Sequence, residues 1–148
     1  MGTWYTIGLC LGLGLGFGVI LSGLLDQFPN LRIGFAECSG GWLPSWLVRL
    51  EGQASYLHPS LPSINNTPLG YAADGRVFCG VELYEGEATV RSIIELIGDD
   101  TLTYQSDYPH DQCIFPKSPD VVLGWSGLAE STLRKMFSTN AERYLRLL

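Results

Sequence analysis

The chain has 148 residues, the length of one ordinary domain, which is enough to bury a core without disulfide or metal cross-links. Its net charge is −6 and its 9 Lys and Arg residues are spread along the chain, which argues against a nucleic-acid-binding surface because such surfaces cluster basic residues. The 4 cysteines are widely spaced without a CxxC pair, so we expect buried thiols in a reducing, cytoplasmic compartment, with disulfides as the alternative.

The N-terminal segment has no charged residue between Trp4 and Leu25, a run long enough to cross a bilayer, which takes about 20 apolar residues. Glycines interrupt this run, and each weakens helix formation by about 1 kcal/mol relative to alanine. We therefore expect an apolar, glycine-rich leader over residues 1–17 and a folded domain over residues 18–148. Membrane association through residues 4–25 is the alternative.

Predicted helices and strands alternate after the leader, a pattern typical of parallel α/β proteins. Helices are expected at 19–27, 44–50 and 87–97, and strands at 31–37, 76–83 and 101–105. Residues 52–75 are rich in turn-forming residues and are interpreted as a long loop with short helical turns. These elements form three strand-helix units.

The C-terminal tail, residues 129–148, is predicted to be helical, with Leu133, Met136 and Phe137 on one face. Thr139 or Asn140 is expected to cap a final helix. The inward residues of that helix are predicted to be Tyr144, Leu145 and Leu148.

Asp107 stands just after the third predicted strand, at a strand end where α/β folds place their chemistry. Its structural alternative is to cap the turn before Tyr108 and Pro109. His110, on the same loop, is expected either to orient Asp107 or contact substrate, or else to bond to backbone carbonyls in the turn.

Two further carboxylates follow predicted strands. Glu37 ends the first strand and is the second catalytic candidate, with binding of the Gly40 and Gly41 amides as its structural alternative. Glu82, near the end of the second strand, is a weaker candidate. His58 is expected at the surface. Three tryptophans are candidates for an aromatic pocket wall but are more commonly packing residues: Trp42, Trp46 and Trp125.

Four runs, in chain order, resemble the C-terminal part of the amidohydrolase-related family that includes the aminocarboxymuconate semialdehyde and resorcylate-type decarboxylases. They are residues 28–37 (FPNLRIGFAE), 40–47 (GGWLPSWL), 106–110 (SDYPH) and 140–144 (NAERY). They are similar to that family's entry into strand six, the glycine-rich turn and helix that follow, the end of strand eight and the closing helix. The resemblance implies an α/β fold that is part of a (β/α)8 TIM barrel, namely its last three βα units plus C-terminal helices.

The same resemblance implies a metal-dependent carboxy-lyase or hydrolase that acts on a small carboxylated, cyclic or aromatic substrate. Asp107 would contact a divalent metal, zinc by family resemblance, and move a proton, with His110 and Glu37 as the other catalytic candidates. The family's strand-one and strand-five metal-binding histidines have no counterpart among the 2 His of this chain.

Three alternatives follow from that missing ligand set and from the N-terminal run. The chain is a non-catalytic remnant, or it is a split-barrel subunit whose missing strands come from a homo-oligomer or from a partner chain. The third alternative is a membrane-anchored module.

Overall fold

A parallel sheet of three strands organises the computed structural model, which describes residues 18–57, 62, 64–110 and 113–147. The strands are β1 (Ile33–Phe35), β2 (Val77–Val81) and β3 (Leu102–Tyr104), and they lie side by side in chain order. In the register, Phe35 is paired with Cys79, and Cys79 with Leu102. The α/β fold and all three predicted strands are confirmed, each strand being shorter than its predicted range.

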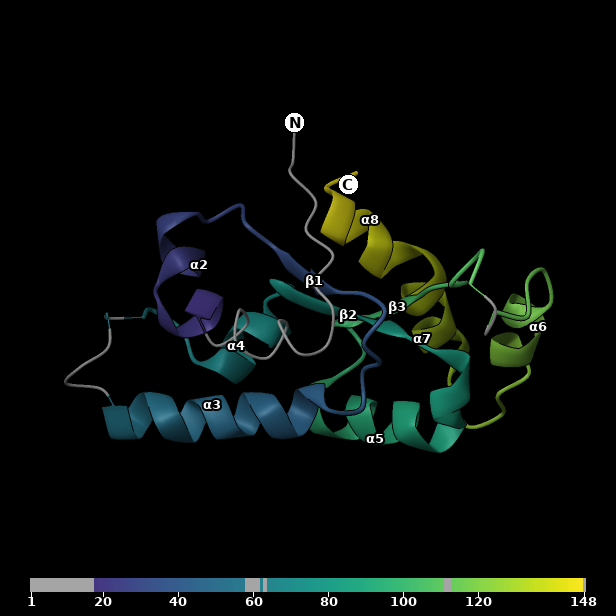
Figure 1. The fold of residues 1–148 in the computed structure, drawn as a ribbon, viewed down its shortest axis with the longest axis horizontal. Coiled ribbons are helices and arrows are strands. Elements are labelled where there is room, and N and C mark those ends of the chain that lie inside the picture. Colours follow the sequence, from purple (N-terminus) through teal and green to yellow (C-terminus); the bar gives the residue numbers. More distant parts are fainter. Residues whose placement is uncertain (1–17, 58–61, 63, 111–112, 148) are drawn as a thin grey trace.

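The helices surround this sheet (Figure 1). They are α2 (Leu24–Gln27), α3 (Leu43–Leu57), α4 (Pro68–Ala73), α5 (Gly86–Ile97), α6 (Ser118–Leu123), α7 (Glu130–Arg134) and α8 (Asn140–Leu145). A 3-10 turn, η2 (Leu83–Glu85), leads into α5, and a π-helical turn, η3 (Lys135–Thr139), joins α7 to α8.

Three helices were not foreseen in full. Helix α3 continues to Leu57, although we expected it to end near Leu50, because Gly52 lies on its exposed side and costs the helix only about 1 kcal/mol. The predicted loop 52–75 contains α4, whose first turn is capped by Thr67, since its hydroxyl accepts a hydrogen bond from the Gly70 amide at 3.0 Å. Helix α6 was not predicted.

The C-terminal helical region is continuous, and this corrects the predicted cap. Thr139 and Asn140 both have helical backbone angles, with φ of −57° and −70°, so neither one caps a new helix. Leu145 is 40% exposed and therefore does not face inward as expected, whereas Tyr144 packs against Phe78 with ring centroids 5.2 Å apart. Leu148 lies outside the described residues.

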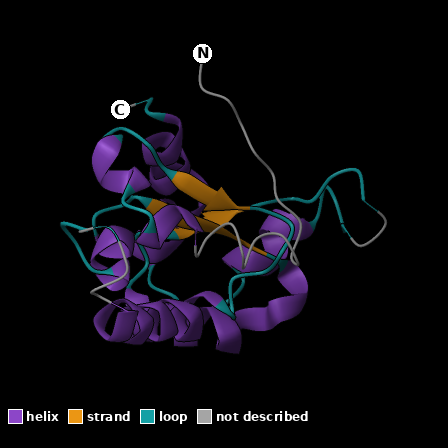
Figure 2. Cartoon of the chain, turned by 60° about the vertical axis from the view of Figure 1, so that its left-hand side comes forward, coloured by secondary structure: helices purple, strands orange, loops and turns teal. Residues whose placement is uncertain are grey.

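Helices cover both faces of β2, which explains why all five of its residues are buried. Val77, Cys79 and Val81 share one core with residues of α3 and α5, and Phe78 points to the opposite face, where α8 lies (Figure 1). Figure 2 shows the strands enclosed between these helical layers. The core residues from α3 and α5 are Leu43, Leu47, Leu50, Val90 and Ile93.

The predicted leader, residues 1–17, lies outside the described residues, so the leader and the membrane anchor stay predictions. Over the part of the chain that the structure describes, no helix has both the length and the apolar character that a membrane crossing requires.

Candidate functional site

Each of the three parallel strands is followed by a carboxylate. Glu37 comes two residues after β1, Glu82 directly follows β2, and Asp107 comes three residues after β3. Because the strands are parallel, their carboxyl ends meet at one edge of the sheet. The carboxylates are therefore gathered at the edge where α/β proteins bind ligands.

The three site residues expected from the sequence, Glu37, Asp107 and His110, lie together. One metal-binding atom of each is within 4.8 Å of the other two. The Nδ1 atom of His110 is 2.6 Å from Oδ1 of Asp107, so the imidazole orients this carboxylate. The Asp107 side chain is 22% exposed and that of His110 is 54% exposed, which leaves the pair accessible to a small ligand.

The backbone at both carboxylates is left-handed. Glu37 and Asp107 each have a φ of 56°, and Ser39 has a φ of 59°. L-residues other than glycine seldom adopt this conformation, Asp more readily than most, and such residues concentrate at functional sites. The loops after β1 and β3 therefore have a backbone that local preference alone does not favour.

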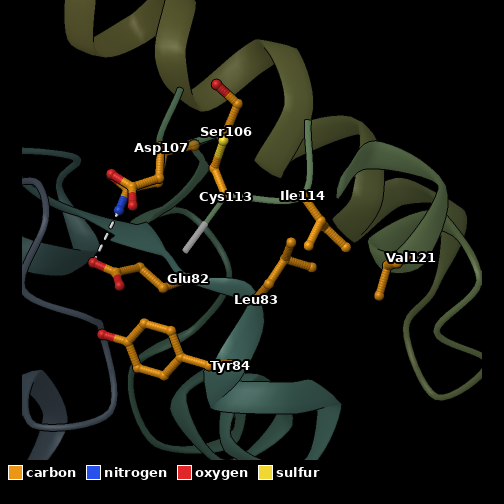
Figure 3. Close-up of a pocket in the computed structure, with 9 residues that line it drawn as sticks. Glu82, Leu83, Tyr84, Ser106, Asp107, Cys113, Ile114 and Val121 are labelled. Carbon is orange, nitrogen blue, oxygen red and sulfur yellow. Dashed lines mark hydrogen bonds between the residues drawn. The ribbon is translucent and has the colours of Figure 1, made fainter. Parts of the chain in front are cut away.

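A cavity of about 510 Å³ opens beside Asp107. Figure 3 shows apolar side chains, Leu83, Ile114 and Val121, on one side and the carboxylates of Glu82 and Asp107 on the other. A concave site with an apolar wall and a few convergent polar groups is the usual form of a small-molecule pocket, and this volume falls in the usual range of about 300–1,000 Å³.

Glu82, which we had considered the weaker candidate, is a buried acceptor that joins two loops of the site. It is only 8% exposed, and its Oε1 atom accepts hydrogen bonds from the Ser39 amide at 3.3 Å and from Nε2 of Gln105 at 3.2 Å (Figure 3). Ser39 belongs to the loop after β1 and Gln105 to the loop after β3. Glu82 thus ties both neighbouring loops to the end of β2.

Glu85 makes the contacts that we had considered for Glu37. Its carboxylate accepts hydrogen bonds from the amides of Gly40 at 3.0 Å and Gly41 at 2.8 Å, and from that of Glu82 at 3.2 Å. The sequence analysis missed this residue. The Glu-x-x-Glu spacing of Glu82 and Glu85 is a capping-box pattern and was the signal that could have found it.

Tyr84 and Cys38 lie beside Glu82 but do not belong to the donor cluster, the group of metal-binding atoms of Glu37, Asp107 and His110. The Tyr84 hydroxyl is 2.7 Å from Oγ of Ser39, and a hydrogen bond to the Glu82 carboxylate raises the pKa of Tyr84. Burial raises the pKa of the Cys38 thiol, and the charge of Glu82 adds to this effect. Cys38 is therefore a buried thiol, as predicted, and Cys79 and Cys113 are also free of disulfides.

The three tryptophans are packing residues, the role that we considered the more common one for them. Trp42 and Trp46 make edge contacts with Phe35, with ring centroids 5.1 and 6.3 Å apart, and they do not line the cavity beside Asp107. Trp125 packs against the core. His58 lies outside the described residues.

The donor cluster fits a divalent metal in chemistry and in size. Two carboxylates and one imidazole are ligands that Zn²⁺ and Mn²⁺ accept. Donor atoms bound to one ion at about 2.0–2.2 Å lie at most about 4.4 Å apart, so atoms within 4.8 Å of one another need only small side-chain shifts.

A sequence model described as amidohydrolase matches residues 19–147 of the chain. The chain belongs to this family. Among curated proteins no match is found. The resemblance inferred from the four sequence runs is confirmed at the level of the family.

Solved structures of decarboxylases have a similar fold. The 5-carboxyvanillate decarboxylase of Sphingomonas paucimobilis is 26% identical, with a TM-score of 0.70, over 88% of this chain. That of Novosphingobium aromaticivorans, complexed with manganese and 4-hydroxy-3-methoxy-5-nitrobenzoic acid, has a TM-score of 0.72 at 24% identity over 90% of this chain. The 2,6-dihydroxybenzoate decarboxylase of Rhizobium has a TM-score of 0.69 at 22% identity over 91%.

The chain spans only part of each of these neighbours, 38% of the two 5-carboxyvanillate decarboxylases and 41% of the 2,6-dihydroxybenzoate decarboxylase. At identities below 25%, the likeness to the second and third structures concerns the fold alone.

Proposed function

We propose that the chain carries active-site residues of a metal-dependent carboxy-lyase or hydrolase that acts on a small carboxylated aromatic or cyclic acid. The observation that supports this most is the place of Asp107, which belongs both to the donor cluster and to the cavity wall. Two of the similar structures are named for decarboxylation of aromatic acids, 5-carboxyvanillate and 2,6-dihydroxybenzoate.

The cavity has room for an acid with a single aromatic ring. Its apolar side, formed by Leu83, Ile114 and Val121, would contact the ring, and polar groups would lie near the reacting carboxylate. Burial of a ring against these side chains would stabilise the complex by about 25 cal/mol for each Å² of apolar surface removed from water.

In this proposal, Asp107 moves the proton. During decarboxylation a protonated Asp107 donates to the ring carbon that bears the carboxylate, the bond from that carbon to the carboxylate breaks with its electron pair left on the ring, and CO₂ departs. In hydrolysis Asp107 instead accepts a proton from water. His110 would orient Asp107 through their contact at 2.6 Å, and Glu37 would be the second carboxylate of the site.

A divalent cation at this site would polarise substrate oxygens. Manganese accompanies an aromatic acid in one of the similar structures, and both Mn²⁺ and Zn²⁺ suit the donors of this chain. The choice between them stays open to experiment.

The arrangement of the sheet supports a place within a (β/α)8 barrel, with residues 18–148 as its C-terminal part. Over the described residues, β1 and β3 are the two edges of the sheet, each paired on one side. Unpaired edges invite further strands. A second copy or a partner chain would supply those strands, which is the split-barrel alternative. Analytical ultracentrifugation of an active preparation tests it, since an active monomer would contradict the need for a partner.

Decarboxylation by the purified chain tests the proposed function. With Mn²⁺ or Zn²⁺ present, we expect turnover of 2,6-dihydroxybenzoate or 5-carboxyvanillate, followed by the ultraviolet absorbance of the product. Asp107→Asn should lower kcat by about 10²- to 10⁴-fold, because it removes the proton donor. Asp120→Asn removes an equal charge on the exposed side of α6 and should leave kcat unchanged. Equal activity of Asp107→Asn and the natural chain would refute the role of Asp107, and an inactive natural chain would refute catalysis of these substrates by the chain.

A further inference from the structure

We propose that the chain binds an oxyanion of the phosphate class at the edge of the sheet opposite Asp107, where the strands begin. Two arginines would contact the anion, Arg32 and Arg146, and two would add positive charge beside it, Arg76 and Arg143. Such a site is separate from the donor cluster and does not depend on the proposed reaction, because it lies at the amino ends of the parallel strands.

The first two of these arginines stand at the starts of neighbouring strands. Arg32 directly precedes β1, and Arg76 directly precedes β2. The Ile33 amide donates a hydrogen bond to the Arg76 carbonyl oxygen at 2.9 Å, so these strand starts are in contact. The guanidinium of Arg76 donates to the carbonyl oxygens of residues 25, 28 and 31, which fixes its position and leaves its charge without a counter-ion.

Helix α8 brings the other two arginines to the same edge. Arg143 lies in the last turn of α8, and Arg146 is the residue that ends this helix. A side chain added at Gly75, the residue before Arg76, would collide with the Arg143 guanidinium, so Arg143 lies against the start of β2. Four of the 9 Lys and Arg residues are therefore gathered at one place in a chain whose net charge is −6.

Arg32 has hydrogen-bond donors that the fold does not use. Its Nε and Nη1 atoms are shielded from solvent and have no hydrogen-bond partner among the described residues. Buried polar groups of native proteins are nearly always paired, so two unpaired donors on one guanidinium indicate a partner that comes from outside the fold. The side chain as a whole is partly exposed, and small rotations of its flexible stem would bring both donors to a ligand from solvent.

The surroundings of Arg32 are positively charged. Burial lowers the pKa of Arg32, and the charges of the other three arginines lower it further, that of Arg146 most. Among the residues that the structure describes, only Arg143 of the four forms an ion pair, with Asp100 at 2.7 Å, and this carboxylate also contacts a lysine. Arginine stays protonated in proteins. An anion would therefore offset the repulsion among these charges.

A phosphate group is the ligand that suits this chemistry. Guanidinium groups bind phosphate and carboxylate through paired hydrogen bonds. A phosphate group carries a charge of about −1.5 to −2 near pH 7, whereas a carboxylate carries a single charge. Three arginines without a carboxylate partner therefore favour phosphate.

Calorimetric titration with inorganic phosphate at low ionic strength measures the site. We expect one saturable phosphate per chain and a phosphate-dependent rise in the unfolding temperature. Arg32→Met and Arg146→Gln should each weaken phosphate binding at least tenfold and remove that rise. Arg91→Gln and Arg134→Gln, which remove one positive charge each from exposed positions on α5 and α7, should bind phosphate like the natural chain.

The unfolding temperature without phosphate separates a ligand-binding role of Arg32 from a structural one. Without phosphate, Arg32→Met should be at least as stable as the natural chain, because it removes an uncompensated charge from a partly buried position. A clear loss of stability in this variant would show that the guanidinium serves the fold, and it would overturn the inference.

Other anions identify the source of the phosphate group. Binding of glycerol 3-phosphate at least as tightly as inorganic phosphate would assign the site to phosphate esters, and binding of inorganic phosphate alone would assign it to the free ion. Three results would overturn the inference: no saturable phosphate binding, unchanged affinity in Arg32→Met, or equally tight binding of succinate or chloride at the same ionic strength.

Discussion

The side-chain amide of Asn140 donates a hydrogen bond to the carbonyl oxygen of Leu102 at 2.7 Å, inside the core. The same nitrogen also donates to the carbonyl oxygen of Asp99 at 2.7 Å. Asn140 is completely buried at the start of α8, so the last helix is fixed to the beginning of β3 through this one side chain. This contact explains why an Asn stands at this buried position of the closing helix.

Asn140→Ala should lower the free energy of unfolding by about 2–4 kcal/mol, because the buried carbonyl of Leu102 and the partly buried carbonyl of Asp99 lose their hydrogen-bond donor. Urea unfolding followed by circular dichroism measures the loss. Thr139→Ala is the matched control and should change stability by less than about 1 kcal/mol, since Thr139 sits inside the continuous helix and does not cap it. Equal losses in the two variants would show that Asn140 has no special anchoring role.

Glu85→Ala should destabilise the fold by about 2–3 kcal/mol, because the amides of Gly40, Gly41 and Glu82 lose a charged acceptor. Glu85→Gln, which keeps one side-chain oxygen, should lose less. Urea unfolding again gives the values. The control is Glu95→Ala on the exposed side of α5, with an expected change within about 0.5 kcal/mol. If Glu85→Ala were as stable as this control, the glycine turn would be held by other contacts.

The sheet could be predicted because its signal is local. The apolar run Val77–Val81 reflects burial of consecutive side chains in a strand, whereas the spacing of Ile93, Ile94 and Ile97 reflects one inward face of α5. Glu37 and Asp107 could be identified as candidates because each follows a predicted strand, and the structure shows that their donor atoms lie close together at the carboxyl edge of the sheet.

The contacts that hold the site could not be predicted from the sequence, because they join residues far apart in the chain. Glu85 binds an amide 45 positions away, and Asn140 binds a carbonyl 38 positions away. Both residues have ordinary local interpretations, a first-turn acid and a helix cap, and only the folded chain shows which partner they take. The ending of α3 was misjudged because Gly52 and its neighbours favour a turn locally, whereas packing of the helix on the core overrides that preference.

Gly34→Ala should lower stability by about 1–3 kcal/mol through overpacking. A Cβ atom there would lie 2.7 Å from both Cζ and Oη of Tyr144, and this ring cannot easily move because it packs on Phe78. In a Tyr144→Ala background the cost should fall, giving a coupling energy of about 0.5–3 kcal/mol in a double-mutant cycle. Gly52→Ala is the control, since no atom lies near its added methyl group, and it should stabilise the chain by up to about 1 kcal/mol. If the effects of Gly34→Ala and Tyr144→Ala on stability were additive, close packing of Tyr144 of α8 against Gly34 of β1 would be refuted.

The Asp99 carboxylate predicts how stability changes in acid. Burial opposes ionisation of Asp99, but hydrogen bonds from Lys135 and Thr132, both at 2.7 Å, outweigh it and lower its pKa. A pKa lowered by folding contributes stability that is present above the unfolded value, about 3.9 for Asp, and that is lost as the pH falls through the lower folded value.

Between about pH 5 and about pH 3, the natural chain should therefore lose more stability than Asp99→Asn. The difference in unfolding free energy between the two proteins should narrow as the pH falls. Urea unfolding at each pH measures it. Asp120→Asn, at an exposed position, should run parallel to the natural chain. A constant difference in unfolding free energy between Asp99→Asn and the natural chain across this range would mean that the charge of Asp99 adds no stability. The contacts of Asp99 with Thr132 of α7 and Lys135 of η3 would then stabilise the fold only as hydrogen bonds that the amide retains.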